Sequence, residues 1–278
     1  MISSTETAAT LAELKAASAE QLRLFYAAKA SVNPNLSIPS IPPTIPKVYA
    51  DTLAEQGQRL AVMSVSEYQG LLQNFFVGLL RAKRIVEVGT FTGASAIFFA
   101  NALKRNGVAG GPDADGNKPV ISLELSDKYA NIARQNVVNA GVEDYIEVIV
   151  GDARENLASL AGQTFDIAFL DADKPSYPVY YDTIIGENIL AKGGLIIADN
   201  TAFDCVTPYI GIPAPVADDA VPIEPSFGPV DQQMGLGQTE IIAKALHNFN
   251  EYVRKDPRTE VVMLPLFTGI SLIRLLDA

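Results

Sequence analysis

From residue 84 onward the chain alternates short runs of β-branched residues with longer stretches of helical periodicity. Strands are expected at 84–88, 119–124, 145–150, 165–171 and 193–199, and helices at 94–104 and 127–140. Strands that alternate with helices pair in parallel through right-handed crossovers. The pattern therefore predicts an α/β fold built on a doubly wound, mostly parallel sheet.

The order of elements changes toward residue 278. A helix is expected at 239–255, followed by strands at 259–266 and 269–276 with only Phe267 and Thr268 between them. A connection this short joins antiparallel strands, so the two runs predict a hairpin that brings the sheet to seven strands.

Before residue 61 the pattern is different. Residues 7–30 show the periodicity of one amphipathic helix, and prolines at 34, 39, 42, 43 and 46 predict an extended strap after it. We therefore expect an extension over 1–60 and an α/β domain over 61–278. A Pro-rich insertion at 207–233 follows a strand end, where ligands bind in open α/β sheets, so it is a candidate lid.

Composition narrows the function. A formal net charge of −11 argues against a nucleic-acid partner, because phosphate binding depends on Lys and Arg. A single cysteine, Cys205, cannot form an intramolecular disulfide or a zinc site of paired thiolates. The first residues lack a secretory pattern, and no run approaches the roughly 20 apolar residues that cross a bilayer. A cytoplasmic protein without a membrane partner is expected.

The segment 87–95, EVGTFTGAS, lies between an expected strand and an expected helix. Gly89 and Gly93 let the backbone turn tightly and approach a ligand. The segment matches neither G-x-G-x-x-G nor a phosphate loop ending in G-K-[ST], and it carries a carboxylate at Glu87. It therefore suits a cationic ligand that bears an amino acid better than a pyrophosphate. The alternative is a tight turn that binds nothing.

The next two strands also end in acidic residues. Glu124 is placed to accept both hydroxyls of a ribose, and Asp152 to accept from an adenine amino group. Each has a simpler alternative, because either side chain could cap the helix that follows it. Three successive acidic strand ends favour a shared cofactor site.

Carboxylates also gather after the fourth and fifth strands. Asp171 and Lys174 follow the fourth, and Asp199 and Asn200 close the fifth. Neighbouring parallel strands bring these groups to one edge, where unpaired carboxylates would repel each other unless a cation lies between them. Two carboxylates and an amide oxygen suit magnesium, with manganese or calcium as alternatives. The alternative is a pair of helix caps with an ion pair between Lys174 and Asp173.

Together these segments resemble the cation-dependent class I O-methyltransferases, the group that includes caffeoyl-CoA and catechol O-methyltransferases. The matching runs are MSVSEYQG, IVEVGTFTGAS, VISLEL, GDA, FDIAFLDADK, GGLIIADN and DPRTEVVMLPLFTGISLIRLL. The resemblance implies a Rossmann-like class I fold and a homodimer. It implies an S-adenosylmethionine site formed by Val65, Glu87, Gly89, Thr90, Ser95, Glu124, Asp152, Ala153 and Asp171. It implies metal ligands Asp171, Asp199 and Asn200, a catalytic Lys174, and an acceptor site that includes Asp173, Phe203 and Asp204.

The implied reaction is metal-dependent transfer of a methyl group to one hydroxyl of a catechol-like or phenolic molecule. Two positions depart from the family pattern: Phe203 replaces a tryptophan of the acceptor wall, and Val65 replaces a threonine that plant members often have. Two other functions stay open at this point, a catalytically silent homologue that binds the cofactor and a nicotinamide-dependent oxidoreductase. The missing G-x-G-x-x-G disfavours the oxidoreductase, and the intact set of Asp171, Lys174, Asp199 and Asn200 disfavours the silent homologue.

Overall fold

A computed structural model describes residues 41–61, 63–202 and 236–276. The helix expected at 7–30, the candidate lid at 207–233, and the acceptor-site residues Phe203 and Asp204 lie outside the described residues.

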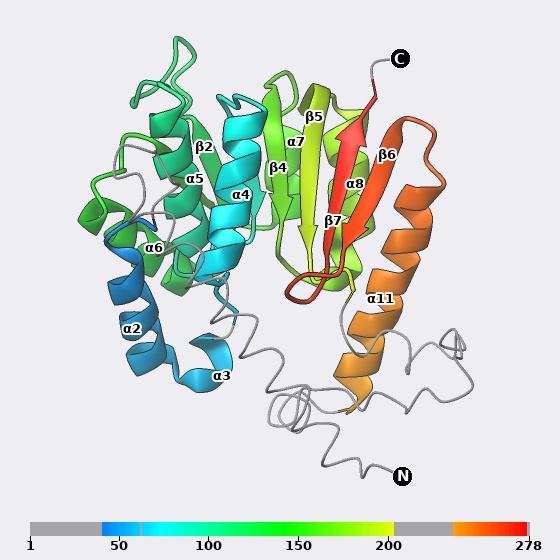
Figure 1. Ribbon diagram of the computed structural model, residues 1–278, viewed down its shortest axis with the longest axis horizontal. Helices are drawn as coiled ribbons and strands as arrows, with labels where there is room; N and C mark the ends of the chain where they lie inside the picture. Colours follow the sequence, from blue (N-terminus) through cyan, green and yellow to red (C-terminus); the bar gives the residue numbers. More distant parts are fainter. Residues whose placement is uncertain (1–40, 62, 203–235, 277–278) are drawn as a thin grey trace, which may run out of the picture.

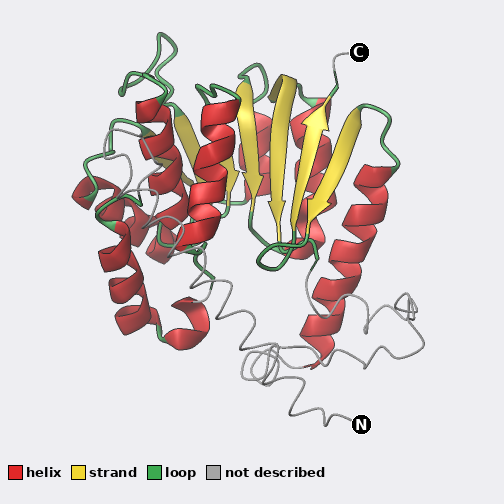
Figure 2. Ribbon diagram, in the orientation of Figure 1, coloured by secondary structure: helices red, strands yellow, loops and turns green. Residues whose placement is uncertain are grey.

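The structure is built on one seven-stranded sheet (Figure 2). The strands are β1 (Ile85–Val88), β2 (Val120–Glu124), β3 (Ile146–Val150), β4 (Phe165–Leu170), β5 (Leu190–Asp199), β6 (Thr259–Leu264) and β7 (Ile270–Leu275). Their order is β3-β2-β1-β4-β5-β7-β6. The first five run parallel, and β7 lies antiparallel between β5 and β6. The predicted α/β sheet with its antiparallel hairpin is thus confirmed.

Helices cover both faces of the sheet (Figure 1). One face carries α4 (Glu67–Leu79), α5 (Ala94–Arg105) and α6 (Asp127–Asn139), and the other carries α7 (Ala153–Ser159), α8 (Tyr177–Gly186) and α11 (Leu236–Arg254). Two hydrophobic cores follow from this arrangement. Alternate residues of β1 enter different cores, since Ile85 joins one and Val86 the other.

Two helices precede the first strand. These are α2 (Ile45–Gln56), which packs beside α5, and the short α3 (Gln58–Ala61). Pro46 was expected in an extended strap, whereas the structure places it in the first turn of α2. Proline is accepted there because the first N–H groups of a helix have no partner within the helix. Neither helix was expected from the periodicity.

Helix α4 was also not predicted as an element. Ser66 caps its start by accepting a hydrogen bond from the backbone N–H of Gln69 at 3.2 Å. None of the helices in the described ranges combines the length and the apolar character that a bilayer-crossing helix needs.

Candidate active site

The loop after β1 lies directly against the end of β4. Gly89 has φ of +100°, and a Cβ atom added there would lie 2.3 Å from the backbone oxygen of Asp171. A side chain at this position would therefore collide with the backbone that carries Asp171. Gly93, with φ of +87°, stands at the start of α5. Gly89 therefore brings the predicted cofactor loop and the predicted metal ligand into contact, whereas Gly93 lies against Ala133 of α6.

Glu87 is fully buried at the end of β1. Its Oε2 accepts a hydrogen bond from Ser122, whose hydroxyl also lies 2.6 Å from Thr90 Oγ1. Its Oε1 has no hydrogen-bond partner of good geometry in the described part of the chain, although Ser95 lies near the carboxyl group. Burial raises the pKa of Glu87 to about 8. The free oxygen is an acceptor that a cationic amino group would satisfy.

Glu124 and Asp152 lie at the next two strand ends. Glu124 accepts from the backbone N–H of Phe91 at 2.7 Å and from that of Ser126 at 2.9 Å, so it joins the β1 loop to the start of α6. Asp152 caps α7, whose first residue is Ala153, by accepting from the backbone N–H of Arg154 at 2.9 Å. The hydrogen bonds from the Arg154 side chain lower the pKa of Asp152 to about 2. The helix-capping alternative is therefore observed for Asp152, whereas Glu124 bonds the backbone N–H of Ser126, the residue before α6.

The strand ends β4 and β5 bring two carboxylates together. Leu170 pairs with Ala198, so Asp171 and Asp199 follow at adjacent positions of the sheet edge. Burial raises the pKa of Asp171 to about 7, and the nearby Asp199 adds to the rise. Burial also raises the pKa of Asp199. Both acids therefore resist carrying a negative charge without a positive partner.

Lys174 supplies one positive charge. It lies in the 3₁₀ turn η1 (Lys174–Ser176), and its Nζ donates to Asp171 Oδ1 at 2.9 Å and to the Tyr177 hydroxyl at 2.8 Å. The alternative ion pair between Lys174 and Asp173 is not formed. Asp173 instead accepts from Ser176 Oγ and from the Tyr180 hydroxyl, each at 2.5 Å. The helical turn points Lys174 back to the residue three positions earlier.

Asn200 follows Asp199 in a left-handed conformation, with φ of +64°, which Asn tolerates better than most residues. Its Nδ2 donates to Thr268 Oγ1 at 2.5 Å, and its backbone N–H donates to Asp199 Oδ1 at 2.8 Å. Thr268 belongs to the turn between β6 and β7, so the hairpin helps to place this side chain. Val65 is buried in the core, and its carbonyl accepts from the Tyr49 hydroxyl at 2.5 Å.

The described residues contain no group of three His, Cys, Asp or Glu side chains that could hold a metal ion. The predicted set is of another kind, since it has two carboxylates and one amide oxygen. A buried carboxylate pair with raised pKa values matches the donor chemistry of a hard divalent cation. The residues present therefore fit such a cation.

Two side chains at this edge were missed by the sequence analysis. Gln69 of α4 is buried near enough to Asp199 to offset part of the rise in the pKa of that acid, although its amide nitrogen forms no hydrogen bond of good geometry with a described residue. Tyr177 was not among the expected site residues, but its hydroxyl contacts the edge. Its spacing of three from Lys174 was the available signal. No comparable signal pointed to Gln69.

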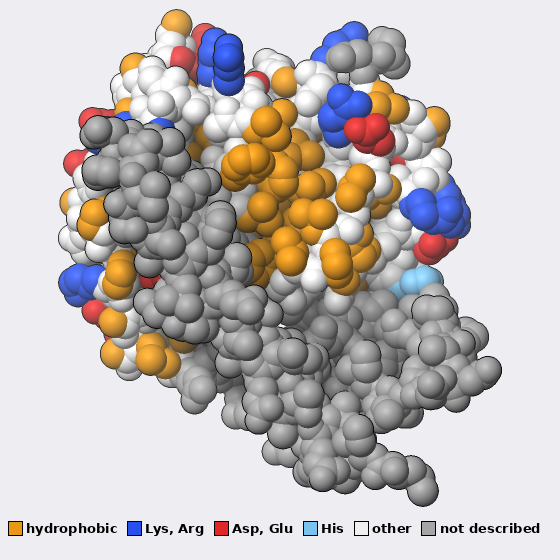
Figure 3. Space-filling model, viewed as in Figure 1, with side chains coloured by type: hydrophobic (Ala, Val, Ile, Leu, Met, Phe, Trp, Pro, Cys, Tyr) orange, Lys and Arg blue, Asp and Glu red, His pale blue; other side chains and the backbone are white. Residues whose placement is uncertain are grey.

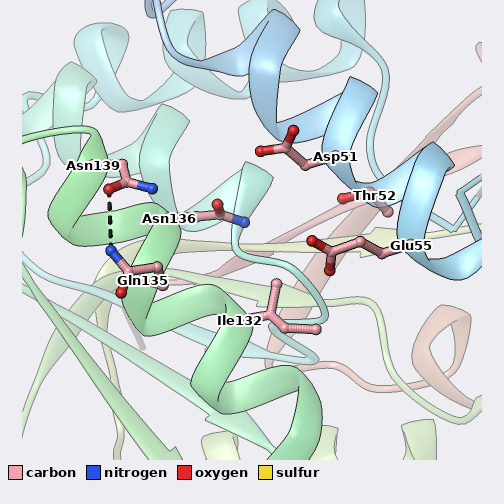
Figure 4. A pocket seen from close by; sticks show the side chains of 7 residues that line it. All are labelled: Asp51, Thr52, Glu55, Ile132, Gln135, Asn136 and Asn139. Carbon is pink, nitrogen blue, oxygen red and sulfur yellow. Dashed lines mark hydrogen bonds between the residues drawn. The ribbon is translucent and has the colours of Figure 1, made fainter.

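A separate small cavity of ≈ 150 Å³ lies between α2 and α6 (Figure 4). Its lining includes Thr52 and Asn136, and both also support the β1 loop. Thr52 bonds the Thr92 hydroxyl at 3.0 Å, and Asn136 donates to the Thr92 carbonyl at 2.9 Å. The cavity contains none of the predicted site residues and stands behind the cofactor loop. Its full lining is Asp51, Thr52, Glu55, Ile132, Gln135, Asn136 and Asn139.

Comparison with known proteins agrees with this geometry. Residues 46–276 match the family model described as O-methyltransferase. The chain belongs to the O-methyltransferase family. The resemblance inferred from the sequence motifs is thereby confirmed, and the protein is an enzyme of this family.

Two curated relatives of this O-methyltransferase are similar in sequence. A catechol O-methyltransferase from Mycobacterium tuberculosis is 35% identical over 155 residues, which cover 56% of this chain and 64% of that protein. A caffeoyl-CoA O-methyltransferase from Populus kitakamiensis is 31% identical over 219 residues, which cover 77% of this chain and 79% of that protein.

Two solved structures resemble the O-methyltransferase fold described above. An SAH-bound methyltransferase from Podospora anserina has a TM-score of 0.68 at 26% identity, covering 85% of this chain and 89% of its own. An O-methyltransferase from Bacillus cereus in complex with SAH has a TM-score of 0.63 at 25% identity, covering 89% of this chain and 97% of its own.

Proposed function

We propose that this O-methyltransferase transfers a methyl group from S-adenosylmethionine to one hydroxyl of a catechol-like or phenolic molecule, with a divalent cation at the carboxylate pair. The observation that carries the proposal is the buried pair of Asp171 and Asp199, with Lys174 beside it and the Gly89 loop in contact. The names of the catechol and caffeoyl-CoA relatives support a phenolic acceptor. The SAH-bound structures support the methyl donor.

The proposed cofactor site uses two buried carboxylates and one exposed ion pair. Glu87 Oε1 is the buried acceptor that the amino group of the methionine part would satisfy. Glu124 is held at the end of β2 by two backbone N–H groups, which orients its carboxylate beside the β1 loop for a ribose. The exposed pair of Asp152 and Arg154 marks the end of the site proposed for adenine.

Asp171, Asp199 and Asn200 are the residues proposed to hold the cation, which we take to be magnesium. When bound, such an ion acts as a Lewis acid that lowers the pKa of the acceptor hydroxyl and orients its two neighbouring oxygens. The positive charge also suits the two acids, because each has a raised pKa in its absence. Asp173 is proposed to contact the acceptor.

Lys174 is proposed as the group that takes up the acceptor proton, for which its amine must first release the proton that it holds in the ion pair with Asp171. Its Nζ lies between Asp171 and Tyr177, so its position is fixed on two sides. The acceptor oxygen forms a bond to the methyl carbon while the sulfonium–carbon bond breaks. The products are a methyl ether, SAH and one proton. Placing the oxygen in line with that bond supplies much of the rate.

An assay series tests the function. Metal-free protein is titrated with S-adenosylmethionine, NADH and magnesium, and then incubated with catechols, flavonoids, hydroxycinnamates and their CoA esters while methylated product is measured. Methylation that requires the added cation is expected. Full turnover in EDTA after verified metal removal would refute the metal proposal. Binding of S-adenosylmethionine without any turnover would favour the catalytically silent homologue. Binding of NADH would favour the oxidoreductase.

Glu124→Ala is expected to weaken S-adenosylmethionine binding by about 1–3 kcal/mol, the usual cost of leaving buried polar partners unsatisfied. The carboxylate is nearly buried and its two backbone donors would also lose their acceptor. Isothermal titration calorimetry measures the affinity. Glu143→Ala, at an exposed position, serves as the control. Unchanged affinity in the Glu124 variant would remove this residue from the cofactor site.

We also propose that the protein forms a homodimer through its apolar surface near α4. Hydrophobic side chains gather over α4 and the neighbouring strands (Figure 3). Exposed examples are Phe75 and Leu79 on α4, 55% and 65% exposed, and Val262 on β6, 57% exposed. Apolar patches of this kind mark interaction surfaces.

Leu79→Asp is therefore expected to shift the protein from dimer to monomer in sedimentation velocity, because a carboxylate would be buried without a partner. Val138→Asp on α6, where the native side chain is 53% exposed, is the matched control and should leave the association state unchanged. Identical sedimentation of both variants and the wild type would argue against this surface as the dimer interface.

The segment 207–233 remains a proposed acceptor lid because it follows Asp199 and Asn200 in the sequence.

A further inference from the structure

Tyr177 begins helix α8 and is fully buried. Its ring packs edge-on against Phe249 of α11, with ring centroids 5.3 Å apart. Its hydroxyl oxygen lies 2.8 Å from Lys174 Nζ, 3.0 Å from the Leu170 carbonyl oxygen and 3.2 Å from the Asp199 carbonyl oxygen. Packing alone would need only the ring, so the hydroxyl requires a separate explanation.

The three partners of this hydroxyl come from three elements. Lys174 lies in η1, Leu170 is the last residue of β4, and Asp199 is the last residue of β5. A phenol has one proton to donate and lone pairs to accept, so the hydroxyl shares its proton between the two carbonyls and accepts from the Lys174 ammonium. Because Leu170 immediately precedes Asp171, one oxygen atom connects the backbones that carry both acids of the candidate metal site.

We propose that Tyr177 is a positioning residue: its hydroxyl holds the Lys174 ammonium and the ends of β4 and β5 in one arrangement, so that Asp171 and Asp199 face the same cation. The inference rests on the proposed function for the nature of that cation and for the role of Lys174. Residues that orient metal ligands without touching the metal commonly change metal affinity by about 10- to 100-fold.

Tyr181 provides a matched comparison within the same helix. It is equally buried, and its ring also faces Phe249, with centroids 6.4 Å apart. Its hydroxyl contacts Asp256 Oδ2 and Thr259 Oγ1, both at 3.0 Å, near the start of β6. Removing the Tyr181 hydroxyl therefore costs a buried polar contact of the same kind at a place remote from the carboxylate pair.

The test compares Tyr177→Phe with Tyr181→Phe in the full chain. Mn²⁺ binding is titrated by electron paramagnetic resonance with SAH in excess, which stabilises the folded state by mass action. Tyr177→Phe is expected to weaken Mn²⁺ binding and lower kcat by about 10- to 100-fold each, with the KM for S-adenosylmethionine within about twofold of wild type. Tyr181→Phe should match the wild type in all three quantities, while both variants melt at similar temperatures.

A second comparison uses Lys174→Met. If the hydroxyl acts partly through Lys174, adding Tyr177→Phe to Lys174→Met should lower kcat by a smaller factor than the same change in the wild type. Equal Mn²⁺ affinity and equal kcat in the Tyr177 and Tyr181 variants would overturn the inference and leave Tyr177 with packing alone. A wild-type protein that binds no Mn²⁺ would instead overturn the proposed metal site itself, which separates the two failures.

Discussion

Asp199→Asn is expected to lower kcat for the proposed methyl transfer by about a thousandfold, since a bound cation supplies several kcal/mol and each 1.36 kcal/mol is tenfold in rate. The replacement keeps the shape of the side chain but removes its charge from the buried pair with Asp171. S-adenosylmethionine affinity should stay close to that of the wild type, because Asp199 is assigned to the cation. Single-turnover kinetics and calorimetry measure the two effects.

The same variant should be more stable than the wild type when metal is removed. Burial raises the pKa of Asp199 in the folded state. A raised carboxyl pKa means that stability is fully present below the unfolded pKa, about 4, and is lost as the pH rises toward the folded pKa. Asparagine does not ionise, so its advantage in thermal melts should appear near pH 8 and shrink near pH 4. Asp144→Asn, at an exposed position, should show neither effect. Normal turnover in the Asp199 variant would remove this residue from the site.

Gly89→Ala is expected to lower the free energy of unfolding by about 2–5 kcal/mol and to abolish turnover in the protein that remains folded. About 1–2 kcal/mol comes from the left-handed backbone, and about 1–3 kcal/mol from forcing an atom into a packed contact. That contact is the Asp171 backbone oxygen, 2.3 Å from the added carbon. The change therefore moves a candidate metal ligand as well as the cofactor loop.

Gly162→Ala separates the two causes. Gly162 has φ of +88°, yet nothing lies within 4 Å of an added Cβ atom. It should lose only the backbone contribution, about 1–2 kcal/mol, and keep full activity. Urea unfolding gives the stabilities. If both glycine variants lose the same stability and both keep full activity, the contact between the β1 loop and Asp171 does not contribute to turnover.

The sheet and its strand ends were predictable because they depend on periodicity. Each acidic residue singled out from β1 to β5 stands at or near a strand end, where the alternation placed it. The contacts between these residues were harder to predict from the sequence. The choice of Asp171 over Asp173 as the partner of Lys174 depends on a single 3₁₀ turn, which composition does not reveal.

Elements outside the alternating pattern of strands and helices were still harder to predict. Helix α2 contains Pro46, which argued against a helix until its place in the first turn was known. Gln69 lies near Asp199 because α4 packs over the sheet, and this proximity relates residues 130 positions apart in sequence. Long-range packing of this kind is set by the whole fold.

The position of β7 has a consequence for how the protein is made. Residues 270–275 lie between β5 and β6, and Asp199 pairs with Ile270. During synthesis, β5 leaves the ribosome long before its neighbour exists, so the edge beside Asp199 stays unpaired while residues 200–269 are added. Pairing between strands so distant in sequence is slow to form. The side of β5 that pairs with β7 is thus among the last parts of the nascent protein to form its hydrogen bonds, and the strands made first have to stay folded without that pairing.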